Sequence, residues 1–224
     1  MKLAIFGTTG GTGRCLVEEA LSRGHEVAAL ARDPGRLQIR DGRLKVFQGD
    51  VLDPSTLDAP IAGADAVVSA LGIGYHRSAT TVYSAGTGNI MAAMAAAGVS
   101  RLSCISASSI ELPPKTFVRQ WLFFRFVLQP MLRRPYADIA RMEEMVRSSD
   151  VDWTIMRPAR LTNGRRRGAY RTGVVKAGEA AGAARAASGK LPRAWSISRA
   201  DLAHYMIGSI DDPVAKRAIV EIGY

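Results

Sequence analysis

The chain has 224 residues, of which 47% are hydrophobic, enough for a large core and too many for a disordered protein. Its net charge is +10, and no helix-turn-helix, zinc-finger or RNA-recognition pattern accompanies that charge. An anionic small ligand or a bias towards arginine therefore explains the charge better than nucleic acid. No apolar run reaches the roughly 18 residues of a membrane span, and the N-terminus lacks a signal-peptide cleavage site, so we expect a cytoplasmic protein.

Apolar, β-rich runs alternate with helical stretches from the first residues onward. We expect strands over 2–6, 26–31, 44–48, 65–70, 101–106, 152–157 and 218–222. We expect helices over 11–23, 80–97 and 135–149, a short helix opened by Asp53 and Pro54, and a last helix opened by a capping box at 198–201. Strands that are apolar on both faces and separated by helices predict a single α/β domain on a doubly wound parallel sheet, the Rossmann fold.

Two segments interrupt this alternation. Residues 115–134 are aromatic among arginines, and we expect a lid over the substrate or an interface helix there, with membrane contact as a third alternative. Residues 163–192 are rich in Gly, Ala and Arg without a period, and we expect a mobile loop. Its cluster Arg165–Arg167 would attract an anionic acceptor or simply be solvated. Cys15 and Cys104 lack metal-ligand neighbours, so we expect buried thiols and no metal site.

The first predicted strand runs directly into a glycine-rich loop. In its G-x-x-G-x-x-G pattern, Gly7 permits a tight turn, Gly10 lets the backbone approach phosphate, and Gly13 lets the next helix pack on the sheet. A dinucleotide pyrophosphate would lie at the helix N-terminus, where free N–H groups and the helix dipole favour negative charge. The predicted cofactor-binding residues of the loop are Gly7, Thr9, Gly10, Gly11, Thr12 and Gly13.

The end of the second predicted strand distinguishes NADP from NAD. An NAD enzyme usually places Asp or Glu there, to bind the ribose 2′-hydroxyl. This chain has Ala31 followed by Arg32, and the planar guanidinium suits a 2′-phosphate. Arg36 adds charge nearby. We therefore predict NADPH as the cofactor, with NAD bound through Asp33 as the alternative.

Several motifs together resemble a known family. They are Ile5-Phe6-Gly7-Thr8-Thr9-Gly10, Ala31-Arg32-Asp33, Gly49-Asp50-Val51-Leu52-Asp53, Ala70-Leu71-Gly72, Gly88-Asn89-Ile90, Ser106-Ala107, Met156-Arg157-Pro158 and Ile197-Ser198-Arg199-Ala200-Asp201. The chain resembles the atypical short-chain dehydrogenase/reductase superfamily over nearly its whole length. Within that superfamily it is similar to the NAD(P)H-binding group that includes flavin reductase/biliverdin reductase B and the NmrA-like proteins.

This resemblance implies roles for residues that follow the strands. It implies that Asp50 and Val51 contact the adenine, and that Ala70, Leu71 and Gly72 contact the ribose and pyrophosphate. It also implies that Ser106 contacts the nicotinamide, and that Pro158 and Ala159 contact its carboxamide. For Asp50 the alternative is a turn cap, and for Ser106 a hydrogen bond at the strand end.

The chain departs from the wider superfamily because it contains no Tyr-x-x-x-Lys; Tyr136 is followed four residues later by Ala140. The resembled subgroup also lacks this pair, and its chemistry is mainly hydride delivery to a stacked planar acceptor. The candidate catalytic residues are Ser106, Tyr136 as an unaided acid, and His76 as a proton donor.

The favoured hypothesis is an NADPH-dependent oxidoreductase, monomer or homodimer, whose acceptor is a flavin, a quinone or a similar planar conjugated molecule. A non-catalytic NADP(H)-binding sensor of NmrA-like type is the main rival. An epimerase or dehydratase is disfavoured, because such enzymes also rely on the missing tyrosine–lysine pair.

Overall fold

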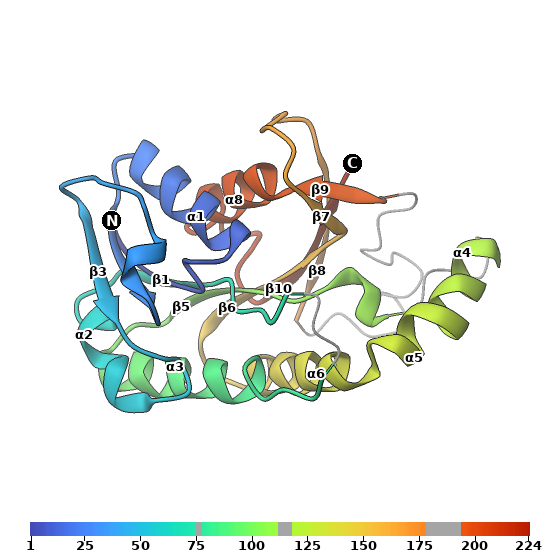
Figure 1. Cartoon of the computed structure of the whole chain (residues 1–224), viewed down its shortest axis with the longest axis horizontal. Helices are drawn as coiled ribbons and strands as arrows, with labels where there is room; N and C mark the ends of the chain where they lie inside the picture. Colours follow the sequence, from blue (N-terminus) through green and yellow to red (C-terminus); the bar gives the residue numbers. More distant parts are fainter. Residues whose placement is uncertain (75–77, 112–117, 178–193) are drawn as a thin grey trace.

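The computed structural model describes residues 1–74, 78–111, 118–177 and 194–224 (Figure 1). Within those ranges an eight-stranded sheet has the order β3-β2-β1-β4-β5-β6-β10-β8, and β7 and β9 form a small second sheet. Neighbouring strands of the large sheet are parallel, except β10 and β8, which are antiparallel. The predicted doubly wound parallel sheet is therefore confirmed.

The strands agree closely with the sequence pattern. Their bounds are β1 (Lys2–Phe6), β2 (Glu26–Ala31), β3 (Leu44–Gln48), β4 (Ala66–Ser69), β5 (Arg101–Ile105), β6 (Asp152–Pro158), β7 (Arg160–Thr162), β8 (Arg171–Lys176), β9 (Ser196–Ser198) and β10 (Ala218–Gly223). Residues of β1 alternate between the two faces, as the two-residue period of a strand requires. Leu3 and Ile5 join one hydrophobic cluster, and Ala4 and Phe6 join the other.

Helices cover both faces of the sheet (Figure 1). Their bounds are α1 (Gly11–Ser22), η1 (Pro34–Arg36), η2 (Pro54–Thr56), α2 (Asp58–Ile61), α3 (Ser84–Ala96), η3 (Ser108–Ile110), α4 (Val118–Phe123), the π-helix η4 (Phe124–Leu128), α5 (Gln129–Met131), α6 (Arg133–Arg147) and α8 (Arg199–Gly208). Helices α1 and α8 pack together on one face, and α3 and α6 pack together on the other. Each pair buries one of the two clusters of the core.

Two predicted helix starts are confirmed by their caps. The Asp53 carboxylate accepts a hydrogen bond from the Ser55 N–H and opens η2, with Pro54 at its first position. The Ser198 hydroxyl accepts one from the Asp201 N–H and opens α8. Because both side chains satisfy N–H groups that the helix itself leaves free, they fix where these helices begin.

Part of the segment 163–192, which we expected to be a mobile loop, is a strand. Residues Arg171–Lys176 form β8, whose partner is β10, with Val174 opposite Val220. This pairing satisfies the backbone of β10 on its outer side, where the parallel sheet would otherwise end. The strand was missed because Arg171-Thr172-Gly173 begins it without an apolar pattern. Residues 178–192 of the predicted loop lie outside the described residues.

An arm formed by residues 118–134 extends beyond the sheet (Figure 1). It contains α4, η4, α5 and the first residues of α6. The Gln129 side chain donates a hydrogen bond to the Ile110 carbonyl, 3.4 Å away, which ties the arm to the segment after β5. The helical part of the predicted 115–134 segment is therefore present, while residues 115–117 lie outside the described residues.

Candidate functional site

The candidate site lies where the strand order of the sheet reverses. Strand β1 is flanked by β2 on one side and β4 on the other, so the connections leaving β1 and β4 turn to opposite faces. In open α/β sheets, ligands bind in the crevice that this reversal leaves at the carboxyl ends of the strands. The glycine loop between β1 and α1 occupies this position.

The glycine loop is shaped by contacts that leave no space for a side chain. Gly7 has φ +78°, and a Cβ built on it would lie 2.4 Å from the Ala70 carbonyl oxygen. A Cβ built on Gly13 would lie 2.1 Å from the Gly7 carbonyl oxygen. Glycine is therefore required at both positions, at the first by backbone conformation and at both by close packing. These contacts hold the turn tightly against β4 and the start of α1.

The N-terminus of α1 has no side-chain cap. Its N-cap is Gly10, which has no side chain to cap the helix, and whose N–H donates to the Gly7 carbonyl at 3.1 Å. The first N–H groups of α1 are thus left for an anion, as in the pyrophosphate-binding turn. Thr8 is fully buried and its hydroxyl donates to the Leu30 carbonyl at 2.8 Å, fixing the loop to β2. Thr9 is half-buried, and Thr12 is buried.

A cluster of exposed arginines lies beside the end of β2. The Arg14 guanidinium donates to the Arg36 carbonyl at 2.9 Å, which brings α1 and η1 together next to Arg32. In the described ranges, Arg32 and Arg36 form no salt bridge. The Asp33 carboxylate caps η1 by accepting from the Gly35 N–H at 3.1 Å. The positive charge here is unneutralised, and the carboxylate that would serve an NAD ribose has a structural partner.

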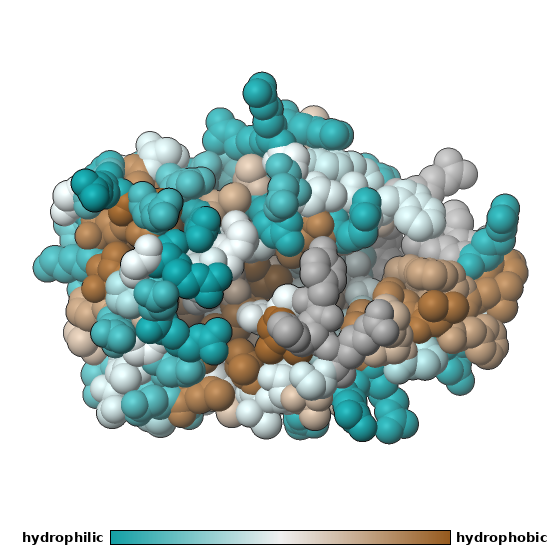
Figure 2. All heavy atoms as spheres, viewed as in Figure 1, coloured by the Kyte–Doolittle hydropathy of each residue, from teal (hydrophilic) through white to brown (hydrophobic). Residues whose placement is uncertain are grey.

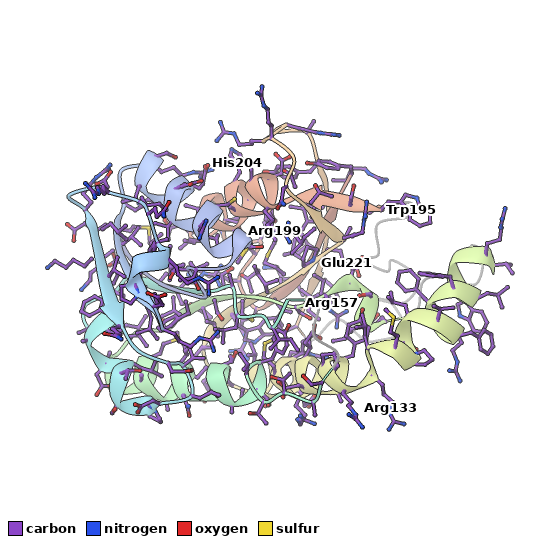
Figure 3. The ribbon with its side chains drawn as sticks, viewed as in Figure 1. Arg133, Arg157, Trp195, Arg199, His204 and Glu221 are labelled. Carbon is purple, nitrogen blue, oxygen red and sulfur yellow. The ribbon has the colours of Figure 1, made fainter. Side chains whose placement is uncertain are left out.

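Arg199 lies beside the glycine loop, and sequence reasoning did not select it as a candidate ligand. It is the first residue of α8, yet a Cβ built on Gly11 would lie 3.0 Å from its Cδ and Nε atoms. Its guanidinium donates to the Asn163 side-chain oxygen at 2.6 Å (Figure 3). In the described part of the chain Arg199 has no carboxylate partner. Gly11 therefore leaves room for a guanidinium beside the open end of α1.

The residues implied to contact adenine and ribose follow β3 and β4. The Asp50 carboxylate accepts from the Leu52 N–H at 3.0 Å, so it caps a turn, which is the alternative noted for it. Val51 is buried, and its carbonyl accepts from the Asn89 side chain at 2.9 Å. These bonds hold the turn after β3 against α3. Their role towards adenine stays a prediction.

The segment after β4 lies against the glycine loop. Ala70 donates its N–H to the Phe6 carbonyl at 3.0 Å, while Leu71 is half-buried and Gly72 is exposed. The Tyr83 hydroxyl accepts from the Ile73 N–H at 3.4 Å and closes this segment from the side of α3. The next candidate, His76, lies outside the described residues.

Ser106 ends β5 in a buried ionic network. Its hydroxyl donates to the Glu143 carboxylate at 2.5 Å, and the same carboxylate receives two bonds from the Arg157 guanidinium, at 2.9 and 2.5 Å. Arg157, labelled in Figure 3, also binds Glu111 at 2.6 Å. Ionic hydrogen bonding of the buried guanidinium to Glu143 and Glu111 outweighs burial and raises the pKa of Arg157. The Ser106 hydroxyl is thus occupied by a protein partner.

A second serine, Ser109, pairs with Tyr136. Their hydroxyl oxygens lie 2.5 Å apart, joining the segment after β5 to α6. A tyrosine phenol is protonated at neutral pH at its ordinary pKa, and burial raises the pKa of Tyr136 further. Sequence reasoning selected Tyr136 and missed Ser109, because Ser109 belongs to no spaced motif. The pair places a proton donor at the carboxyl ends of the strands.

Ala140 stands four residues after Tyr136, where the Tyr-x-x-x-Lys motif has its lysine, and it is exposed. The nearest cation in sequence, Arg141, binds Asp138 at 3.0 Å. Asp138 is fully buried and also accepts from the Tyr83 and Ser84 N–H groups, so it caps the start of α3. Arg141 therefore pairs with a structural carboxylate and not with the phenol of Tyr136.

The remaining predicted residues line the end of β6. Pro158 is its last residue, and Ala159 is buried and donates its N–H to the Ile222 carbonyl at 3.0 Å. Of the basic cluster, Arg166 pairs with Glu19 at 3.2 Å, and the Arg167 guanidinium lies 4.6 Å from the centre of the Tyr224 ring. Two of the three cluster arginines thus contact the body of the protein.

The fold and crevice together define a Rossmann-type nucleotide-binding protein. Residues 7–213 match the NAD(P)H-binding family, and the chain belongs to that family. The uncharacterized protein YwnB of Bacillus subtilis is 28% identical over 180 residues, which cover 77% of this chain and 79% of YwnB.

Two further comparisons concern proteins with a named activity or ligand. A (4-alkanoyl-5-oxo-2,5-dihydrofuran-3-yl)methyl phosphate reductase of Streptomyces griseus is 31% identical over 157 residues, covering 70% of this chain and 46% of that enzyme. A short-chain dehydrogenase/reductase of Veillonella parvula, solved in complex with NADP, superposes with a TM-score of 0.76 over 100% of this chain and 94% of that one. At 15% identity, the second likeness is one of fold.

Proposed function

We propose that the protein is an NADPH-dependent reductase that delivers hydride to a planar conjugated acceptor such as a flavin or a quinone. The observation that carries the proposal is the glycine loop of residues 7–13, with the Arg199 side chain against Gly11 and the exposed Arg32 directly after β2. The tight turn at Gly7 and the open start of α1 fit a pyrophosphate. The chain's membership of the NAD(P)H-binding family supports this assignment.

The preference for NADPH over NADH rests on charge at the end of β2. Arg32 and Arg36 are exposed and unpaired in the described ranges, and Arg14 adds a third guanidinium held at the Arg36 backbone. A 2′-phosphate would neutralise this charge, whereas a 2′-hydroxyl would leave it unbalanced. Asp33, the alternative ligand for an NAD ribose, already caps η1.

Arg199 would complete the phosphate site from the opposite side. Its guanidinium lies against Gly11 at the start of α1 and is oriented by Asn163. The pyrophosphate is common to NADPH and NADH, so this arginine would bind both cofactors and discriminate between neither. Arg32 would thus set the preference for NADPH over NADH, while Arg199 would strengthen the binding of both cofactors.

The acceptor is proposed to bind at the carboxyl ends of β4, β5 and β6. Bound nicotinamide supplies the hydride, and the protein orients the acceptor and provides a proton. The proposed donor is the Tyr136 phenol, whose hydroxyl lies 2.5 Å from that of Ser109, and whose pKa burial raises further above neutral pH. Ser106 acts indirectly, by holding Glu143 and with it Arg157 beneath the end of the sheet. The relative from Streptomyces griseus is itself named a reductase.

A non-catalytic NADP(H) sensor is the second candidate. It is favoured by Ala140, which stands where a lysine would lower the tyrosine pKa, and by the engagement of Arg141 with Asp138. Both candidates share the cofactor site, so cofactor binding alone does not separate them.

The test follows NADPH absorbance with purified protein and a panel of FMN, riboflavin, menadione and a polycyclic quinone. A reductase oxidises NADPH in an acceptor-dependent way, and the Tyr136→Phe variant does so more slowly while binding NADPH equally well. Tight NADPH binding with no turnover on any acceptor would overturn the reductase and leave the sensor. Tyr205→Phe, on α8, is the matched control for loss of a phenol.

A further inference from the structure

The arm of residues 118–134 exposes a continuous apolar face. The exposed side chains are Val118 (59%), Leu122 (43%), Phe123 (51%), Phe126 (64%), Val127 (49%) and Met131 (36%). Val118, Leu122 and Phe126 follow one another at four-residue intervals, as do Phe123, Val127 and Met131, so they form two adjacent rows along the helical axis. Figure 2 shows this apolar surface gathered on the arm.

The face of the arm directed away from solvent is different. Trp121, Phe124 and Leu128 are half-buried at three- and four-residue spacing, and Gln129 is bonded to Ile110. The arm is therefore already anchored by one side, and its exposed rows are not the side that packs on the protein. A lid that closed over the crevice with its anchored side would leave the exposed rows in water.

Positive charge surrounds this apolar face. Arg119, Arg125, Arg133 and Arg134 are exposed, and none of them forms a salt bridge within the described ranges (Figure 3 labels Arg133). The Arg125 guanidinium lies 5.7 Å from the centre of the Phe126 ring, so charge and apolar surface are in contact. The sequence has no acidic residue between Glu111 and Asp138.

We propose that this arm docks the protein on an anionic lipid surface. Apolar and aromatic side chains flanked by arginines are the composition that inserts at the headgroup boundary, where arginine meets lipid phosphate and the rings enter the acyl region. A second copy of the chain is a poorer occupant, because pairing two such faces would bring like charges together. No described helix is long and apolar enough to cross a bilayer, so the contact is peripheral.

The experiment is vesicle flotation of the whole protein. Vesicles of phosphatidylcholine alone are compared with vesicles containing about one third phosphatidylglycerol. The protein is expected to float with the anionic vesicles and to be released by salt. Arg133→Gln with Arg134→Gln should weaken binding by about fivefold per arginine. Leu122→Ser with Phe126→Ser should remove it.

Matched controls lie outside the arm. Val214 is 53% exposed and Arg147 is an exposed arginine on α6, so Val214→Ser and Arg147→Gln remove similar groups and should leave flotation unchanged. NADPH affinity, measured in parallel, should be unchanged in all variants and reports folding. If the parent protein did not bind NADPH, the proposed cofactor site would be wrong, while the flotation result would still test the docking proposal.

Three outcomes would overturn the docking proposal. The first is no flotation with anionic vesicles. The second is a dimer in solution that the Leu122→Ser and Phe126→Ser substitutions dissociate, which would assign the face to a second copy. The third is a rise in the KM of a water-soluble acceptor in the arm variants with vesicle binding intact, which would assign the arm to the substrate as a lid.

Discussion

Two arginines far apart in the sequence are the proposed ligands of the cofactor phosphates at the glycine loop, residues 7–13. Arg32 follows β2, and Arg199 begins α8. Only Arg32 stands where a strand-end rule indicates cofactor specificity. Arg199 reaches the site because α8 packs against α1 and because Gly11 has no side chain. The absence of a side chain at Gly11 is therefore as informative about the candidate site as the charge of Arg32.

We predict that Arg199→Ala weakens NADPH and NADH binding to the same extent, by about 1–3 kcal/mol, the usual worth of a charge-assisted contact. Arg199→Lys should recover part of this loss, because lysine keeps the charge and loses the planar fork. Fluorescence titration with both cofactors measures the effect. A loss confined to NADPH would assign Arg199 to the 2′-phosphate, and no loss would remove it from the site.

At Tyr136 the decisive property is its protonated phenol. We predict that Tyr136→Phe lowers kcat for the preferred acceptor about 100-fold, in the range expected for loss of a general acid, and leaves NADPH affinity intact. Ser109→Ala should lower kcat less, because it loses only the orienting partner. Steady-state kinetics give the answer. An unchanged kcat in Tyr136→Phe would mean that the proton comes from water or another residue.

Among the elements, the turn between β1 and α1 is the most constrained. We predict that Gly13→Ala lowers the free energy of unfolding by about 1–3 kcal/mol, because its Cβ would overlap the Gly7 carbonyl and force α1 outwards. Gly10→Val should perturb the fold less than Gly13→Ala, because a Cβ there lies 3.3 Å, not 2.1 Å, from the same carbonyl and the backbone has φ −77°, and it should abolish binding of both cofactors. Urea unfolding and cofactor titration separate the two effects.

Gly42→Ala is the control for both substitutions, since a Cβ at Gly42 meets no atom within 4 Å. The account of the turn would be contradicted by a Gly13→Ala variant as stable as this control. It would also be contradicted by a Gly10→Val variant that still binds NADPH.

The central strands and long helices could be predicted because their signals are local. Continuous apolar runs such as 3–6 and 27–31 indicate buried strands, and Ser198 caps α8 within four residues of sequence. Strand β8 could not be predicted, since its stability comes from pairing with β10, a strand distant in the sequence, with Val174 opposite Val220. Local pattern carries no information on such a partner.

Some residues of the candidate site could likewise be predicted from the sequence, and others could not. The loop 7–13 and Arg32 follow from motif and position, and the family match supports a nucleotide there. Ser109, Arg199 and the Glu143–Arg157 pair depend on contacts between elements distant in sequence. Ser106 was chosen because it ends a strand, and the structure adds its bond to Glu143, which no spacing rule predicts.

For the molecule as a whole, the buried sheet is sensitive to alkali. Cys104 lies fully buried in β5, and burial, followed by the nearby charge of Glu143, raises its pKa from 9.0 to about 12. The folded state therefore holds a proton that the unfolded state releases above pH 9. The stability linked to this thiol is complete below pH 9 and is lost as the pH rises towards 12.

We predict that the free energy of unfolding falls by about 1.4 kcal/mol per pH unit over that interval because of Cys104, and that Cys104→Ala removes this slope. The cavity left by the substitution lowers stability equally at every pH. Urea unfolding between pH 8 and roughly 11 measures the slope. Cys15→Ala, at a half-buried thiol, should flatten it less. Equal slopes in the parent and Cys104→Ala proteins would contradict the assignment.

The central claim is that backbone N–H groups of the β1–α1 turn hold a pyrophosphate while Arg32 selects the 2′-phosphate. Isothermal titration calorimetry of the folded protein with NADPH and NADH tests it most directly. The account predicts tighter binding of NADPH, and a loss of about 1–3 kcal/mol for NADPH alone in Arg32→Ala, with Arg147→Ala unchanged. No heat with either cofactor, or an equal loss for both in Arg32→Ala, would contradict it.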